Sequence, residues 1–118
     1  MNRIEITVLK PQAALDAFAR TWRRVEADKE AKPRLAFGSL RELFSAITEK
    51  RLELLRYVAT HEAPNVRQLA QGLERNYKNV YTDVRDLLEL GLLEKSDQGR
   101  LTAPFDEIVI HAELRDAA

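Results

Sequence analysis

The segment between residues 65 and 91 most strongly limits the fold, because it carries signals for two helices separated by a very short turn. Asn65, followed three residues later by Gln68, matches a capping box, in which each side chain satisfies a free backbone N–H at a helix start. Residues 77–90 then repeat apolar side chains at three- and four-residue spacing. Gly91 is well placed to end that helix in a left-handed conformation. The segment therefore predicts a helix, a tight turn and a longer helix.

Two more helices are predicted before this segment. Ser39 with Glu42 matches a second capping box, and a short helix should follow it. Thr48 is a further N-cap candidate, for a helix that ends before Pro64. The residues expected to face inward on that helix are Leu52, Leu55, Val58 and Ala59.

Extended segments surround the helices. Residues 92–95 and 100–103 are joined by the turn-forming residues 96–99, which predicts a hairpin. Residues 3–9 alternate in polarity as a half-buried strand does, with Ile4, Ile6 and Val8 on one face. Residues 106–114 predict another strand, with one side formed by Ile108, Ile110, Ala112 and Leu114.

An amphipathic helix is predicted over residues 12–29, with Pro11 suited to its first turn. Its apolar stripe includes Trp22, which we interpret as a core or dimer anchor in preference to a ligand platform. The stretch 31–38 predicts a connection with a short extended piece at residues 35–37.

These elements predict an α+β fold, mainly α, in a single domain, because 118 residues are too few for two independent cores. The predicted core is 39–103, with a strand and helix before it in 1–34 and a strand after it in 104–118. The absence of cysteine excludes disulfides, thiolate metal sites and cysteine catalysis. Without a long apolar run or a signal peptide, we expect a cytoplasmic protein with no membrane contact.

The order helix, helix, tight turn, helix, hairpin is that of a winged helix-turn-helix unit. If Val80 faces the core, the opposite side of its helix carries Lys78, Thr82, Arg85 and Glu89. Hydrogen-bond donors also gather at the start of this helix, where its dipole favours phosphate. This polar face is suited to a DNA groove.

Candidate DNA contacts fall into three groups. The candidates for reading base edges are Lys78, Asn79, Thr82 and Arg85. The candidates for backbone contacts and for the donor cluster at the helix start are Arg67, Gln68, Arg75, Asn76, Tyr77 and Tyr81. On the hairpin, the candidates for flanking phosphates or the minor groove are Lys95, Gln98 and Arg100.

Some of these side chains have an equally good structural interpretation. Tyr77 lies close to the core side of its helix and could pack against the turn. Lys95 and Arg100 fit an ordinary solvated hairpin as well as a DNA contact. The net charge does not decide between DNA contact and a structural role. Residues 65–100 carry six basic and six acidic side chains, and the whole chain has a net charge of +0. His61 and His111 have no metal-ligand spacing, so we expect neither a metal nor a cofactor.

The stretch VRQLAQGLERNYKNVYTDVRDLLELGLLE, with LFSAITEKRLELLRYV before it, resembles the MarR-like winged-helix predicted transcriptional regulators of bacteria and archaea. In those proteins the pattern xxVxxDVxxLxxLGL marks the recognition helix, and here its residues are Val80, Asp83, Val84, Leu87, Leu90, Gly91 and Leu92. The resemblance implies a DNA-binding winged helix, and some such proteins look like antitoxins of small toxins. One departure is Glu74, which stands where those proteins usually carry glycine.

The function we expect is sequence-specific DNA binding by a transcriptional regulator, either a dimeric repressor or the antitoxin of a toxin-antitoxin pair. The alternative is a winged-helix module for protein association, an antitoxin or adaptor without specific DNA binding. An enzyme is not expected, because the sequence has no Ser, His and carboxylate cluster, glycine-rich phosphate loop or metal signature. The expected partners are double-stranded DNA, a second copy bound through the flanking elements with its terminal strands paired within or between subunits, and a toxin protein.

Overall fold

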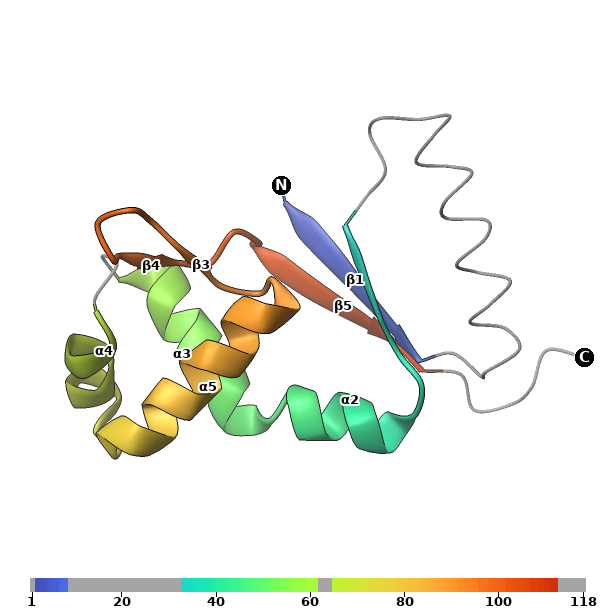
Figure 1. Cartoon of the computed structure of the whole chain (residues 1–118). Coiled ribbons are helices and arrows are strands. Elements are labelled where there is room, and N and C mark those ends of the chain that lie inside the picture. Colours follow the sequence, from blue (N-terminus) through green and yellow to red (C-terminus); the bar gives the residue numbers. More distant parts are fainter. Residues whose placement is uncertain (1, 9–32, 62–64, 113–118) are drawn as a thin grey trace, which may run out of the picture. The chain divides into compact units, whose positions relative to one another are not determined.

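A computed structural model describes residues 2–8, 33–61 and 65–112 of the chain. These residues form the predicted α+β fold, with four helices, a parallel three-stranded sheet and a small antiparallel hairpin (Figure 1). The chain divides into two compact units, residues 1–45 with 107–118, and residues 46–106. None of the described helices is long and apolar enough to cross a membrane. The helix predicted over residues 12–29, with Trp22, lies outside the described residues.

The first unit is built around a sheet in which β1 (Arg3–Val8) lies between β2 (Arg34–Phe37) and β5 (Glu107–His111). Both pairings are parallel, and Ile6 pairs with Leu35 of β2 and with Ile110 of β5. The strands predicted near both ends of the sequence are confirmed, as is the short extended piece before Gly38. The sequence left open whether terminal strands pair within or between subunits, and here β1 and β5 pair within one chain.

Burial differs between the strands of this sheet. Ile4 and Ile6 on the central strand keep 4% and 0% of their surface exposed. On the edge strand β5, Ile108 is half-buried and Ile110 remains 44% exposed. An edge strand has a neighbour on one side only, so its side chains are less covered. Leu114, which was expected on the same side as these two residues, lies outside the described residues.

The short helix α2 (Leu40–Ala46) begins where the Ser39 signal predicts. The Ser39 hydroxyl accepts a hydrogen bond from the backbone N–H of Glu42 at 3.1 Å. The Glu42 carboxylate accepts one from the N–H of Gly38, at 2.9 Å, where a regular capping box would use the N–H of Ser39. The predicted start is therefore confirmed, with the return contact moved by one residue.

The second unit contains α3 (Glu49–Thr60), α4 (Val66–Leu73) and α5 (Tyr77–Leu90), followed by a hairpin of β3 (Glu94–Lys95) and β4 (Leu101–Thr102). The residues that were predicted to cap these helices do so in the structure. Thr48 caps α3 through a hydrogen bond to the N–H of Arg51, and the capping box of Asn65 and Gln68 is complete. Gly91 ends α5 with a φ of 78°.

The core of the second unit is formed by apolar residues from its three helices, from β4 and from the two leucines before β3. The largest fully buried side chains are Leu54, Leu69, Val80, Leu87, Leu92, Leu93 and Leu101. On α3 the buried stripe is Leu54, Leu55 and Val58, while Leu52 is half-buried. The prediction that Ala59 faces inward is wrong, because Ala59 is exposed and Leu54 takes the inner position. On a helix Val58 falls between Leu54 and Leu55, whereas Ala59 falls outside this arc, on the solvent side of Leu55.

A close contact between α3 and α4 depends on Gly72. A Cβ atom built on Gly72 would lie 2.1 Å from the hydroxyl oxygen of Tyr57 and 2.6 Å from its ring carbon Cζ. The Tyr57 ring is itself stacked on His61, with centroids 3.8 Å apart. The Tyr57 ring can therefore lie against α4 in this position only because residue 72 lacks a side chain.

We predict that Gly72→Ala destabilises the fold by about 1–3 kcal/mol, because the added methyl group overpacks this contact. Urea unfolding followed by circular dichroism measures the effect. In a Tyr57→Ala background the same substitution should become favourable by up to about 1 kcal/mol, since alanine is the better helix former once the clash is absent. A stabilising Gly72→Ala in the otherwise unchanged chain would contradict the contact.

Candidate functional site

The turn between α4 and α5 consists of three residues, Glu74, Arg75 and Asn76. Glu74 adopts the left-handed conformation, with φ 54° and ψ 44°, and its N–H donates to the carbonyl groups of Ala70 and Gln71. This conformation costs a residue with a side chain on the order of 1 kcal/mol. Glu74 thus occupies a conformation that glycine adopts without this cost.

Asn76 completes the turn by capping α5. Its side-chain oxygen accepts hydrogen bonds from the N–H groups of Lys78, at 2.8 Å, and Asn79, at 3.4 Å. The first turn of α5 therefore begins immediately after the turn residues, which fixes the direction in which its side chains point.

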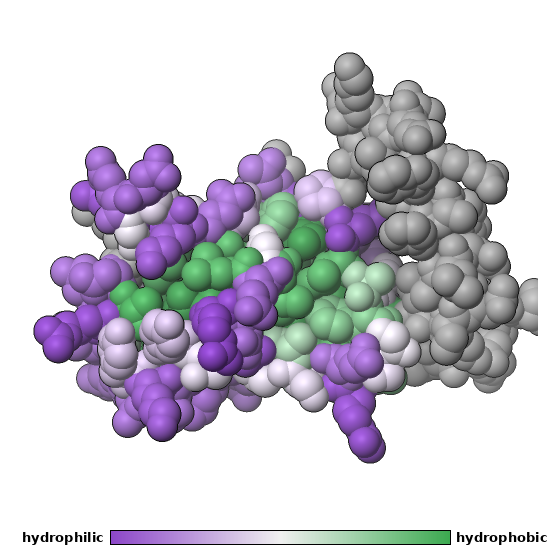
Figure 2. All heavy atoms as spheres, in the orientation of Figure 1, coloured by the Kyte–Doolittle hydropathy of each residue, from purple (hydrophilic) through white to green (hydrophobic). Residues whose placement is uncertain are grey.

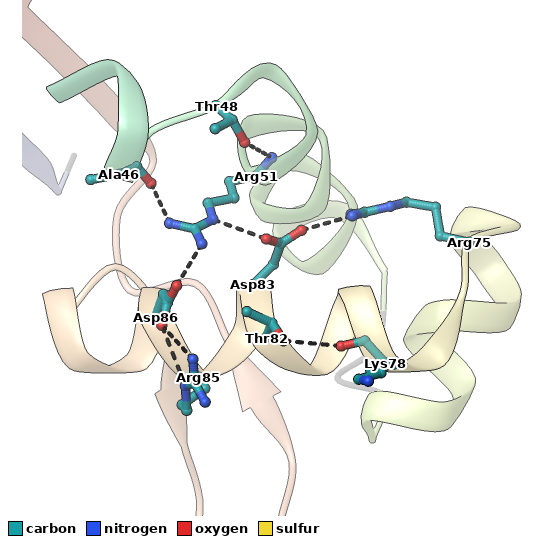
Figure 3. A network of polar contacts seen from close by, with 9 residues as sticks. All are labelled: Ala46, Thr48, Arg51, Arg75, Lys78, Thr82, Asp83, Arg85 and Asp86. Carbon is teal, nitrogen blue, oxygen red and sulfur yellow. Dashed lines mark hydrogen bonds and ion pairs between the residues drawn. The ribbon is translucent and has the colours of Figure 1, made fainter. Parts of the chain in front are cut away.

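A network of ion pairs behind α5 connects it to α3 and to the turn (Figure 3). Arg51 of α3 donates from Nε to the Asp83 carboxylate at 3.0 Å, and from Nη2 to the Asp86 carboxylate at 2.6 Å. Arg75 of the turn donates to the other oxygen of Asp83 at 2.8 Å. Arg51 Nη1 also donates to the carbonyl of Ala46 at 2.9 Å. One carboxylate, that of Asp83, thus joins a helix and a turn from different parts of the sequence.

These charged groups are largely excluded from solvent. The side chains of Arg51, Asp83 and Arg75 keep only 12%, 14% and 16% of their surface exposed. Burial lowers the pKa of Arg51, but the hydrogen bonds and charges of Asp83 and Asp86 outweigh that effect and raise the pKa above its ordinary value. Within the described residues, Arg75 Nη1 is buried without a hydrogen-bond partner. The network therefore holds its charges inside the unit.

The opposite side of α5 is open. Lys78, Tyr81 and Arg85 are all exposed, with 50% of Tyr81 and 57% of the Arg85 side chain accessible. Tyr77 remains 52% exposed, which favours a surface position over packing in the core. The rings of Tyr77 and Tyr81 stack with centroids 6.3 Å apart. Figure 2 shows mostly hydrophilic side chains over the end of this unit that α4 and the start of α5 form.

The structure brings the predicted site residues together to different degrees. Thr82 is half-buried, and its hydroxyl donates to the carbonyl of Lys78 at 3.1 Å. Arg67 and Gln68 are exposed at the start of α4, where Gln68 accepts from the N–H of Asn65. Arg75 points into the ion-pair network. The remaining predicted residues are exposed, on α5 and on the hairpin: Asn79, Lys95, Gln98 and Arg100.

Two open hollows border these residues. One, of about 730 Å³, lies between α4 and the start of α5 and is lined by Arg67, Ala70, Gln71, Glu74, Arg75 and Tyr77. The other, of about 460 Å³, is lined by Thr48, Glu49, Lys50, Arg75, Asn79, Thr82 and Asp83. Among the described residues, no group of three His, Cys, Asp or Glu side chains is placed to hold a metal ion. Both hollows mix basic and acidic groups, so neither is a site of one charge.

Arg51 is the functional-site residue that the sequence analysis missed. Asp83 stands out as part of a recurring helix pattern, but its partner Arg51 lies 32 residues earlier. The sequence did contain one signal, an acidic residue on the side of α5 that faces the core. A charge in such a position requires an opposite charge nearby. The sequence alone does not tell which of several cations supplies it.

We predict that Asp83→Asn destabilises the protein by about 3 kcal/mol, because it removes the charged partner of the enclosed Arg75 and one of the two charged partners of Arg51. Arg85→Gln is the matched control, since its contact with Asp86 is long, at 3.4 Å, and exposed. The control should cost less than about 1 kcal/mol. Equal losses for both variants in urea unfolding would show that the network does not hold the turn.

A comparison with known protein families gives a match. The sequence model of a family described as HVO_A0114 matches residues 46–110. The matched region contains α3, α4, α5 and the hairpin, and ends within β5. Neither the curated proteins nor the solved structures give a match.

Proposed function

This chain belongs to the HVO_A0114 family, and on that premise we propose that its matched region is a winged helix-turn-helix that binds double-stranded DNA and regulates transcription. In this proposal α4 and α5 form the helix-turn-helix and α5 enters the major groove. The hairpin of β3 and β4 is the wing.

The observation that carries the proposal is the division of charge across α5. Two of its three acids, Asp83 and Asp86, pair with Arg51 on the side that faces α3. On the exposed side lie Lys78 and Arg85, with Glu89 near the end of the helix, and Arg85 also contacts Asp86 at 3.4 Å. A surface binds the phosphates of a duplex more strongly when the carboxylates near it form ion pairs within the protein, because unpaired acids repel the duplex. The neutral composition of the chain therefore coexists with two exposed cations, Lys78 and Arg85, on this helix before Glu89.

The side chains have separate roles in this proposal. Lys78, Asn79 and Arg85 are exposed donors for base edges, and Thr82 adjoins them. Arg67 and Gln68 on α4 contact the backbone. Lys95, Gln98 and Arg100 on the wing reach flanking phosphates. Arg75 and Asn76 shape the turn through the contacts described above, so they act on DNA binding by positioning α5.

The first unit supports a homodimer in the proposal. Its exposed large apolar residues include Leu40 and Phe44 on α2, at 40% and 64%, and Ile110 on β5, at 44%. Exposed apolar side chains of this size favour burial against a partner. A two-fold dimer would present its α5 helices to half-sites about 34–36 Å apart on a palindromic operator.

A second candidate is a module for protein association, such as an antitoxin that binds a toxin through the same apolar residues. The observation that favours it is the exposure of Phe44 together with a net charge of +0. Stoichiometric recovery of a protein partner, without salt-sensitive DNA binding, would support this candidate against the first. In neither case do we propose an enzyme.

We predict that Lys78→Ala and Arg85→Ala each weaken binding to a duplex selected from a random pool by roughly 5- to 100-fold, because each removes a base contact. Fluorescence anisotropy at fixed salt measures the affinity. Arg56→Ala is the matched control, since Arg56 is an exposed cation on α3. Unchanged affinity in both α5 variants would remove α5 as the recognition helix.

We predict that Phe44→Glu converts the dimer into a monomer in light scattering, because it places a charge in the proposed apolar contact. The monomer should also lose the advantage of a palindrome over a single half-site in DNA binding. Arg41→Glu, an exposed position on the same helix, serves as the control and should leave the dimer intact. A Phe44→Glu variant that remains dimeric places the contact elsewhere.

A further inference from the structure

Two aromatic rings stand on the exposed side of α5 among polar groups. Tyr77 and Tyr81 keep 52% and 50% of their surface accessible. An aromatic ring has a large apolar surface that is stabilised by burial, so two half-exposed rings side by side are available to contact a ligand. Their rings stack with centroids 6.3 Å apart and an interplanar angle of 29°. The pair thus forms a small apolar ridge along the first two turns of the helix.

The ridge borders the cations of the same helix. Tyr81 follows Lys78 by three residues and precedes Arg85 by four, and such spacings make neighbours on a helix surface. Both cations are exposed. A ligand that contacts Lys78 and Arg85 therefore also meets the ring of Tyr81, and such a ligand must combine negative charge with apolar groups.

Duplex DNA offers this combination in one place. In the major groove the apolar group that base pairs present is the C5-methyl of thymine, next to acceptors on the neighbouring bases. Successive bases of one strand are about 3.4 Å apart along the axis. The 6.3 Å between the two ring centroids is close to the length of two such steps.

We infer that Tyr77 and Tyr81 read the C5-methyl groups of two thymines about two base pairs apart in the bound duplex. The inference rests on the proposed DNA binding and names the chemical group that this part of α5 recognises. Lys78 and Arg85 contact acceptors on adjacent bases, and the tyrosine rings cover the methyl groups between them. The tyrosines are specificity-determining residues under this inference.

The test compares the selected duplex with copies in which single thymines are replaced by deoxyuridine, which removes only the methyl group. With the wild-type chain, each of two substitutions should weaken binding about fourfold, the value expected for one buried carbon. Tyr77→Ala and Tyr81→Ala should bind the thymine duplex more weakly, and each should no longer distinguish uracil from thymine at one of the two positions. Tyr81→Phe keeps the ring and should keep the discrimination.

Lys78→Ala is the matched control, since it should weaken both duplexes equally and preserve the uracil penalty. Circular dichroism of each variant checks that the half-exposed tyrosines can be replaced without unfolding. The inference is overturned if the wild type binds uracil and thymine duplexes equally, or if the alanine variants retain the penalty at both positions. If the wild-type chain selects no duplex from the pool, the proposed function falls and this inference with it, whereas the previous two outcomes leave DNA binding intact.

Discussion

The carboxylate of Asp83 is the point on which the second unit depends. It accepts from Arg51 of α3 and from Arg75 of the turn, and all three side chains are mostly enclosed. A carboxylate held by two guanidinium groups in a poorly hydrated place has few alternative arrangements, since each charge needs the others. This contact and the apolar core between the two helices together hold α5 against α3.

The turn shows how that constraint is combined with local strain. Glu74 occupies a left-handed conformation that glycine would adopt at no cost, yet the next residue, Arg75, is bound to Asp83. The strain of Glu74 is on the order of 1 kcal/mol, which is less than the roughly 3–5 kcal/mol that breaking an enclosed ion pair typically costs. The short turn therefore holds its geometry without a glycine at residue 74.

Much of the fold was predictable because its signals are local. Thr48, Asn65 and Gly91 mark helix ends through contacts within four residues of themselves, so reading the sequence in short windows finds them. The wrong and the missing predictions concern residues whose positions depend on contacts that are distant in the sequence. Ala59 was placed inward from spacing alone, and Arg51 was overlooked because its partners follow 32 and 35 residues later. The spacing of apolar residues shows which residues share a face of a helix or strand, but it does not show which other residues pack against that face.

The same distinction applies to charge. A net charge of +0 argues against a nucleic-acid surface when the chain is treated as a whole. The structure separates part of the charge by position, since Asp83 and Asp86 are held by Arg51 while Lys78, Arg85 and Glu89 stay on the exposed side. Electrostatic attraction at a groove is screened within about 8–10 Å, so it reports the nearest few charges and not the sum over the chain. In this chain, the charge that the exposed side of α5 offers to a ligand depends on which acids of the helix are paired with Arg51 on its inner side.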